Sequence, residues 1–422
     1  MIRAGIACCI GASLNDTESF SPFQFRFEEV RSPDFLDQLS VLDKAILANQ
    51  TAADQRNDLY TPLEDYPEDR LEELTPFGIL KLGEPLYKGY ESVVYTVENR
   101  PDLIIKYQAM CHDLGKPMLH PLVTDFWYSK KANQLGIAPE PLFLSPPAQL
   151  CDVLSRERNK KFPFTIPEKN LNSCLEQGGI VRYMILRRSE GLNLHQFRRR
   201  HFPNGIVPMK TAASILILII RALSVLHDSG KIVHGDIHLG NILMDPVAPG
   251  SSQYRVLLID FGRAMMDDRS LTNDRVNKPG EWNHQLCSPW QVDGRAWSRR
   301  DDVYKAVHGF AALINPTQFY IREHWMLKRM RIRDQVQMKK ERFMFFMAHP
   351  VVENEIRYDS DFDPILNTAS GDFTRLIQIE DELRQIQSLV TFALDDINAS
   401  ISYDELVRRL ERLATITTRS TQ

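Results

Sequence analysis

Two stretches of the sequence decide its fold: IVHGDIHLGNIL at residues 232–243 and LIDFGR at residues 258–263. Asp236 and Asn241 lie five residues apart on one predicted loop, and Asp260 follows the end of a predicted strand. Carboxylate and amide oxygens are the hard ligands that Mg²⁺ prefers in proteins. The two stretches therefore predict a site that combines oxygen ligands for a cation with a further acid.

Phosphoryl transfer is a reaction that such residues suit, because it is catalysed mainly by positioning and by neutralisation of phosphate charge. We expect Asp236 to act as the base beside an attacking hydroxyl, and Asn241 and Asp260 to bind Mg²⁺. The competing interpretation of Asp236 is that it only caps a turn. His234 is expected to face the core and brace the loop rather than to act as an acid.

The two motifs resemble those of the protein-kinase-like superfamily, whose catalytic loop reads His-x-Asp-x-x-x-x-Asn and whose metal-binding turn reads Asp-Phe-Gly. Here they occur in that order after a strongly apolar segment, and the resemblance covers about residues 78–395. It implies an α+β, bilobal protein-kinase-like fold with a small antiparallel β-sheet in the N-lobe and a mainly helical C-lobe. It also implies ATP and Mg²⁺ as cofactors, held between the lobes.

Upstream, the resemblance extends to the hairpin that covers ATP in this family. Val94 matches the apolar residue after the glycine loop, and Lys106 matches the lysine that holds the α- and β-phosphates. The usual three glycines reduce to Gly89, with Tyr87 and Ser92 at the outer positions. Backbone amides approach phosphates closely only when no side chain intervenes, so we expect a weaker grip on nucleotide.

Asp125 is the expected partner of Lys106, at the place where the family has a glutamate on the following helix. Aspartate is one methylene shorter, so the helix must sit closer or the ion pair must be weaker. The alternatives are a solvated acid at a helix start for Asp125 and a plain surface lysine for Lys106.

The catalytic loop also departs from most protein kinases. Gly235 replaces the arginine that senses activation-loop phosphorylation, so control by that route is not expected. His238 stands where Ser/Thr kinases place a lysine, and we expect it to contact the γ-phosphate as a hydrogen-bond donor. The pattern His-Gly-Asp-x-His is typical of small-molecule kinases such as aminoglycoside and choline phosphotransferases.

Other features of the C-terminal half favour a protein kinase. Ser288-Pro-Trp290 lies where the family anchors the end of its activation segment, and SRRDDV at residues 298–303 is similar to the casein-kinase-one branch. On that resemblance Asp302 or Asp301 is structural. The basic run at residues 198–201 is interpreted as a solvated helix end rather than a phosphate site.

Three functions stay open. The first is an atypical Ser/Thr protein kinase, the second a small-molecule phosphotransferase, and the third a pseudokinase that binds nucleotide or a partner. Tyr87 stands where the family has a glycine and Asp125 where it has a glutamate, and these departures favour the third function. The complete set Asp236, Asn241 and Asp260 favours the first two.

Composition excludes little beyond this. The chain of 422 residues has 51 Lys and Arg against 55 Asp and Glu, a formal net charge of -4, so bulk binding to nucleic acid or to an anionic membrane is not expected. No apolar run reaches the roughly 20 residues of a membrane span. Residues 1–13 have the outline of a weak signal peptide, or form an unstructured start, so a cytoplasmic and a secreted location both stay open.

The expected organisation is an N-terminal extension at residues 1–76, a kinase-like domain at 77–395 and a C-terminal helix and tail at 396–422. The domain divides into an N-lobe at 77–190 and a C-lobe at 191–395. Ser402-x-x-Glu405 is a capping box that opens the last helix. Periodicity and turn residues predict strands at 79–82, 92–97, 103–107, 180–186 and 255–259, and helices at 123–135 and 211–227.

Overall fold

The computed structural model describes residues 24–25, 72–88, 92–110, 120–145, 148–149, 179–202, 207–248, 250–267, 298–314, 356–358, 364–366, 373–391 and 402–416. Gly89, the signal-like residues 1–13, the Ser288-Pro-Trp290 anchor and all six cysteines lie outside these ranges. The described residues form a mixed α+β fold with an antiparallel sheet and a group of helices, as the sequence predicts at this level.

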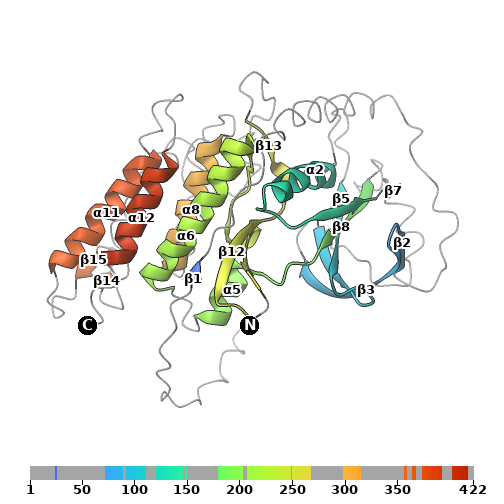
Figure 1. Cartoon of the computed structure of the whole chain (residues 1–422), viewed down its shortest axis with the longest axis horizontal. Helices are drawn as coiled ribbons and strands as arrows, with labels where there is room; N and C mark the ends of the chain where they lie inside the picture. The colour runs from blue at the N-terminus through green and yellow to red at the C-terminus, as the bar shows by residue number, and fades with distance from the viewer. Residues whose placement is uncertain are drawn as a thin grey trace, which may run out of the picture.

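A seven-stranded antiparallel sheet occupies one side of the molecule (Figure 1). Its strand order is β2-β3-β4-β5-β8-β6, and β7 also pairs with β8. The predicted strands are all present, with longer bounds in most cases. The strands of this sheet are β2 (Glu72–Thr75), β3 (Gly78–Lys88), β4 (Ser92–Val97), β5 (Leu103–Met110), β6 (Pro141–Leu144), β7 (Ala148–Gln149) and β8 (Ile180–Arg187), of which β2, β6 and β7 were not predicted.

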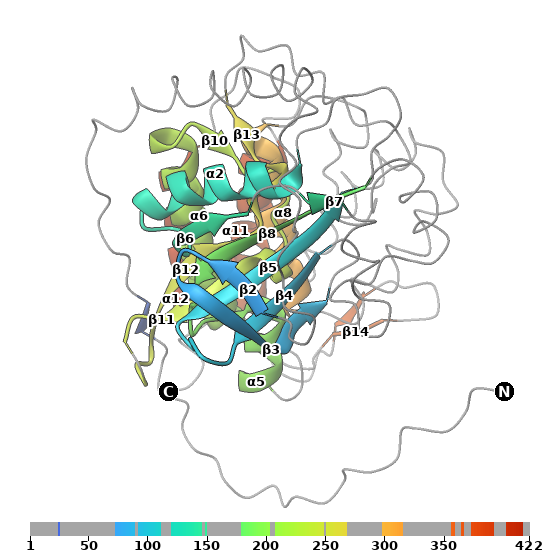
Figure 2. The same cartoon turned by 90° about the vertical axis from the view of Figure 1, so that its right-hand side faces the viewer.

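The two faces of β5 bury different groups, because successive side chains of a strand point to opposite sides. Leu103, Ile105 and Tyr107 enter the hydrophobic cluster on one face of the sheet. Ile104 belongs to a second cluster on the other face, where helix α2 (Pro121–Gln134) lies along β5, β6 and β8 (Figure 2). Lys106 shares the parity of Ile104, so its side chain points toward α2.

The other side of the molecule is helical. Helices α6 (Met209–Ser224), α8 (Arg299–Ile314), α11 (Phe373–Thr391) and α12 (Tyr403–Ile416) lie side by side (Figure 1), and α5 (Leu194–His201) is joined to their core. α6 continues as a π-helix, Val225–Ser229, where the sequence predicts a regular helix to residue 227. The division of sheet and helices into two lobes stays a prediction.

Burial accounts for the apolar character of α6, which packs against both α8 and α12. Among the described residues, Met209–Ser229 is the one stretch long and apolar enough to cross a membrane by length and composition alone. In the structure, 56% of its most apolar part is buried. The expected absence of a membrane span therefore stays a prediction.

Segments outside the predicted kinase-like domain also contribute to the fold. β2 begins at Glu72 and pairs with β3. On α12, Leu406, Leu410 and Leu413 are fully buried in the same core as α6. The Ser402 hydroxyl accepts a hydrogen bond from the Glu405 N–H at 3.3 Å, which is half of the predicted capping box.

Short strands hold the two sequence motifs together. The loop at residues 234–241 lies between β10 (Ile232–Val233) and β11 (Ile242–Pro246), and Asp260 lies between β12 (Gln253–Leu258) and β13 (Met265–Met266). β10 pairs with β13, and β11 pairs with β12. The two loops therefore lie next to each other. The remaining strands are β1 (Gln24–Phe25), β9 (Leu192–Asn193), β14 (Ile356–Tyr358) and β15 (Pro364–Leu366).

Candidate functional site

Lys106 is held between two carboxylates. Its Nζ lies 2.7 Å from Asp125 Oδ2 and 2.9 Å from Asp260 Oδ1. Burial by itself lowers the pKa of Lys106, but the two carboxylates outweigh it and raise this pKa above its usual value. The ion pair that the sequence predicts between Lys106 and Asp125 is therefore present, and Asp260 joins it.

Asp125 joins α2 to the turn at residues 260–263. Asp125 Oδ1 accepts hydrogen bonds from the Phe261 N–H at 2.8 Å and from the Ser129 hydroxyl at 3.0 Å. A Cβ added to Gly262 would lie 3.6 Å from the Pro121 carbonyl, so this turn is in contact with the first residue of the helix. The two expectations for an aspartate here, a closer helix or a weaker ion pair, stay predictions.

Asp260 has an uncommon backbone conformation, with φ 65° and ψ 66°. This left-handed region is sparsely populated by residues other than glycine, and such residues gather at functional sites. Burial raises the pKa of Asp260, but the Lys106 ammonium lowers this pKa by more than burial raises it. The pKa of Asp260 therefore lies below its usual value. The side chain is nevertheless 42% exposed, so an ionised oxygen can reach a ligand.

Asp236 and Asn241 share the neighbouring loop, as predicted. Asn241 Nδ2 donates to the Asp236 backbone carbonyl at 3.0 Å, which leaves the Asn241 amide oxygen to bind a cation. Arg263 Nη1 lies 3.8 Å from Asp236 Oδ1. No group of three or more His, Cys, Asp or Glu suited to a metal occurs in the described ranges. A carboxylate and an amide fit Mg²⁺, which commonly takes one or two carboxylates and completes its shell with water and phosphate oxygens.

His234 braces the loop from inside. It is fully buried, and its ring packs against Phe261 with centroids 4.5 Å apart and an interplanar angle of 41°. Its Nδ1 accepts the Asp236 N–H at 3.3 Å and its Nε2 lies 3.1 Å from the Ile259 carbonyl. These contacts agree with the expected role as a brace, because both ring nitrogens already have backbone partners.

Asp302 anchors the same loop from α8. Its carboxylate accepts the His234 N–H at 2.6 Å and the Gly235 N–H at 2.9 Å. Gly235 has φ 78°, a conformation that favours glycine. Burial raises the pKa of Asp302, but the hydrogen bonds from His227 and from the His234 N–H help to lower it below its usual value. Of the two structural candidates, Asp302 is thus the one that contacts the loop at residues 234–241.

His238 begins the 3₁₀ turn Leu239–Asn241, and its Nδ1 accepts the Gly240 N–H at 3.0 Å. Burial lowers the pKa of His238, while Asp236 and Asp260 oppose this shift. Burial also lowers the pKa of His195, on α5, to about 4. Both histidines are therefore neutral at pH 7, and His238 can donate only through Nε2.

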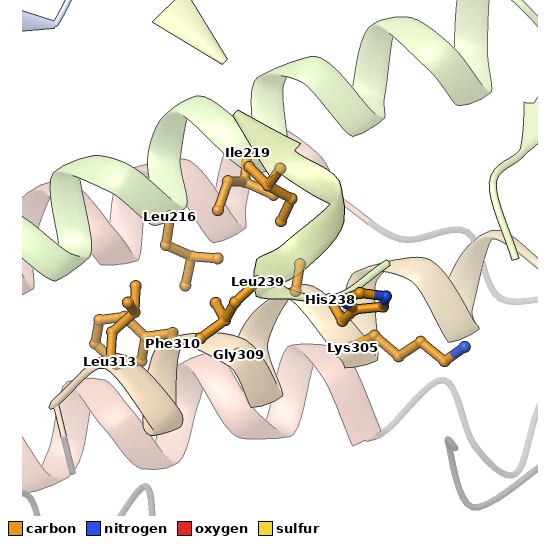
Figure 3. Close-up of a pocket in the computed structure, with 10 residues that line it drawn as sticks. Leu216, Ile219, His238, Leu239, Lys305, Gly309, Phe310 and Leu313 are labelled. Carbon is orange, nitrogen blue, oxygen red and sulfur yellow. The ribbon is translucent and has the colours of Figure 1, made fainter. Parts of the chain in front are cut away.

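A small cavity of about 10 Å³ lies behind this turn, between α6 and α8. Figure 3 shows the His238 ring and the Lys305 side chain next to each other at one end, with apolar side chains at the other. Lys305 Nζ donates to the Gly235 carbonyl at 2.9 Å. The cavity has room for about one water molecule, so it is not a nucleotide site.

The structure thus brings together six predicted site residues: Lys106, Asp125, Asp236, His238, Asn241 and Asp260. Val94 lies beside Lys106 in the β4–β5 register. Sequence reasoning missed three contributors: Arg263 beside Asp236, Lys305 beneath Gly235, and His227 behind Asp302. Arg263 directly follows a recognised motif, which was an available signal, whereas nothing near Lys305 marked it out.

Comparisons with known proteins show similarity at the level of solved structures only. No protein-family model and no curated protein matches the chain. Among solved structures, the chain is similar to one described as "Structure of vaccinia related kinase 3", at 15% sequence identity and a TM-score of 0.49, over 85% of this chain and 93% of that chain. The likeness concerns backbone arrangement alone, so the proposals below rest on the residues and their geometry.

Proposed function

We propose that this chain transfers a phosphoryl group from ATP to a hydroxyl in a Mg²⁺-dependent reaction, as an atypical Ser/Thr protein kinase. The observation that carries the proposal is the Lys106 ammonium held by Asp125 and Asp260, beside a loop that presents Asp236 and Asn241. Positioned charge of this kind is the main requirement of phosphoryl transfer.

Each residue has a defined part in this proposal. Lys106 would contact the α- and β-phosphates, and Asn241 and Asp260 would hold Mg²⁺, which neutralises phosphate charge. Asp236 would accept the proton of the attacking hydroxyl. The hydroxyl oxygen would then bond to the γ-phosphorus as ADP leaves. The Asp236 side chain is 22% exposed, so a hydroxyl can reach it.

A protein acceptor is supported by the long segment after Gly262 and by the SRRDDV string at residues 298–303. The second candidate is a small-molecule acceptor, and neutral His238 favours it. A neutral imidazole gives the transferring phosphate a hydrogen bond but less charge than the lysine of Ser/Thr kinases.

The first experiment measures Mg²⁺-dependent ATP turnover and autophosphorylation of the wild type beside Asp236→Asn and Asp260→Asn. Asp102→Asn is the matched control, because it makes the same chemical change in an exposed turn. We expect both site variants to lose at least a hundredfold in turnover, as is typical when a general base or a key electrostatic group is removed. The control should match the wild type.

Two results would contradict the proposal. Wild-type turnover that survives both site substitutions would come from a contaminant or from another site. An inactive wild type that ATP nevertheless stabilises against heat would favour the pseudokinase. If the wild type is active, a parallel screen of peptides and of hydroxylated metabolites separates the two acceptor classes.

A further inference from the structure

The C-terminal helix α12 reaches the back of the catalytic loop through one side chain. The Tyr403 hydroxyl lies 2.6 Å from His227 Nδ1, and His227 Nε2 lies 3.0 Å from Asp302 Oδ2. Asp302 in turn accepts the N–H groups of His234 and Gly235. A continuous chain of hydrogen bonds therefore joins α12 to the residue before Asp236.

When His227 is neutral, the protons along this chain have one consistent arrangement. Asp302 is ionised, so it can only accept, and His227 must donate from Nε2. In a neutral imidazole Nδ1 is then an acceptor, and Tyr403 must donate to it. Burial, with Asp228 and Asp302 nearby, raises the pKa of Tyr403, so the phenol keeps the proton that it donates.

Neighbouring charges do not compete for the hydroxyl. Arg299 Nη1 lies 2.8 Å from Asp228 Oδ1, and Arg299 Nε also pairs with Asp267. These three charged groups surround Tyr403 and influence its pKa, yet they bind one another. The imidazole of His227 is thus the hydroxyl's hydrogen-bond acceptor.

A local irregularity places His227 in this position. The π-helix Val225–Ser229 interrupts the ordinary helical pattern and closes with a hydrogen bond from the Gly230 N–H to the Val225 carbonyl at 3.1 Å. A Cβ added to Gly230 would lie 2.6 Å from the Leu226 carbonyl, so glycine is needed to close this turn. π-Helical turns are rare in proteins, and those that occur often lie at functional sites.

We propose that Tyr403 is a positioning residue for the catalytic loop. Its hydroxyl holds the His227 ring in the orientation in which Nε2 donates to Asp302, and Asp302 so held orients the backbone that carries Asp236. The expected effect of Tyr403 on catalysis rests on the proposed function, whereas its effect on the order of the loop does not. Docking of α12 then decides whether the loop is ordered for catalysis.

Tyr403→Phe tests this proposal, because it removes the hydroxyl and keeps the ring. Glu411→Gln is the matched control: it removes a different polar contact between α6 and α12, the exposed pair Arg221 Nη2–Glu411 Oε1 at 3.2 Å. Both full-length variants are compared with the wild type by ¹⁵N-histidine NMR, with His227 assigned from its loss in His227→Asn. Amide hydrogen exchange of residues 232–241 and ATP turnover are measured in parallel.

We expect His227 to keep the Nε2–H that Asp302 requires in all three proteins, and the ¹⁵N resonance of its Nδ1 to move in Tyr403→Phe alone, because Nδ1 loses its hydroxyl partner there. Loop amides should exchange roughly tenfold faster in Tyr403→Phe, the scale of one lost hydrogen bond. Turnover should fall by a similar factor with the KM for ATP unchanged, because the nucleotide contacts are intact.

The outcomes separate the two proposals. An unchanged Nδ1 resonance and unchanged exchange in Tyr403→Phe would overturn the positioning role, whatever the activity. Equal losses in Glu411→Gln would also overturn it, because they would indicate general loosening of α12. If the wild type shows no turnover but the NMR and exchange results are as expected, the proposed function fails while the positioning of the loop by Tyr403 stands.

Discussion

The two hydrogen-bonded networks around the loop at residues 234–241 differ in how far solvent and ligands can reach them. The front network joins Lys106 to Asp125 and Asp260, and Asp260 keeps 42% of its side chain exposed. The back network joins Asp302 to His227 and Tyr403, and the side chains of Asp302 and His227 have no exposed surface. Ligands can therefore reach the front network, whereas the centre of the back network is closed to them.

This difference indicates a division of labour. Buried charges are tolerated only when hydrogen bonds and partners satisfy them, and in the back network every contact of Asp302 serves to hold backbone or His227. In the front network, the exposed part of the Asp260 carboxylate remains available to a ligand. Substitutions should therefore affect stability most in the back network and chemistry most in the front network.

Asp302→Asn should have the largest effect on folding. The amide keeps the shape but removes the charge that accepts two backbone N–H groups and His227, so we expect a loss of about 3 kcal/mol in the free energy of unfolding. Urea unfolding measures it. Asp301→Asn is the matched control, one residue away, because Asp301 accepts from Ser298 at the start of the same helix. A control loss as large as that of Asp302→Asn would contradict the special role of Asp302.

Lys106→Met breaks the front network and should cost about 2 kcal/mol of stability, because it leaves the buried Asp125 carboxylate without its cation. The double variant Lys106→Met with Asp125→Asn should recover part of this loss. The Asn oxygen can still accept from the Phe261 N–H and the Ser129 hydroxyl.

Activity should stay absent in both front variants, although their stabilities differ. Thermal unfolding and ATP turnover measured on the same samples check this separation. A double variant that is less stable than Lys106→Met would show that the loss does not come from an unpaired carboxylate.

Sequence predicted the front network well because its residues lie at fixed offsets in recognisable motifs. Lys106 ends an apolar run, and Asp260 follows a strand, so local pattern and resemblance agree on both. The back network had no such signal. His227 lies within a segment whose apolar periodicity predicts a regular helix, and the π-helical turn depends on contacts that no local window contains.

Distance along the chain explains why the role of Tyr403 could not be predicted from the sequence. Tyr403 is 176 residues from His227, and its local sequence indicates only the start of a capped helix. Its hydroxyl obtains a role only when α12 packs on α6. Likewise the strand β2 lies outside the expected domain, because four residues, EELT, give too short a pattern to assign before its partner is known.

Acid should weaken the back network before it disrupts the apolar core. The pKa of Asp302 is lower in the folded chain than its usual 3.8, so the folded state binds fewer protons than the unfolded state at low pH. The stability contributed by Asp302 is thus complete above about pH 5 and is lost as the pH falls through the folded pKa. Urea midpoints between pH 3 and pH 6 should fall less steeply for Asp302→Asn than for the wild type. Parallel slopes would contradict the lowered pKa.

Ser129→Ala should have the smallest effect, and it tests how finely the front network is tuned. The Ser129 hydroxyl is one of several donors to Asp125, so its loss should cost about 1 kcal/mol in unfolding and raise the KM for ATP by no more than a few fold. Ser214→Ala is the matched control, since its hydroxyl bonds only back to the Lys210 carbonyl of its own helix, and its stability should change by less than about 0.5 kcal/mol. If Ser129→Ala abolishes turnover while stability is unchanged, Ser129 contacts the reacting groups and the front network is larger than the three residues that define it.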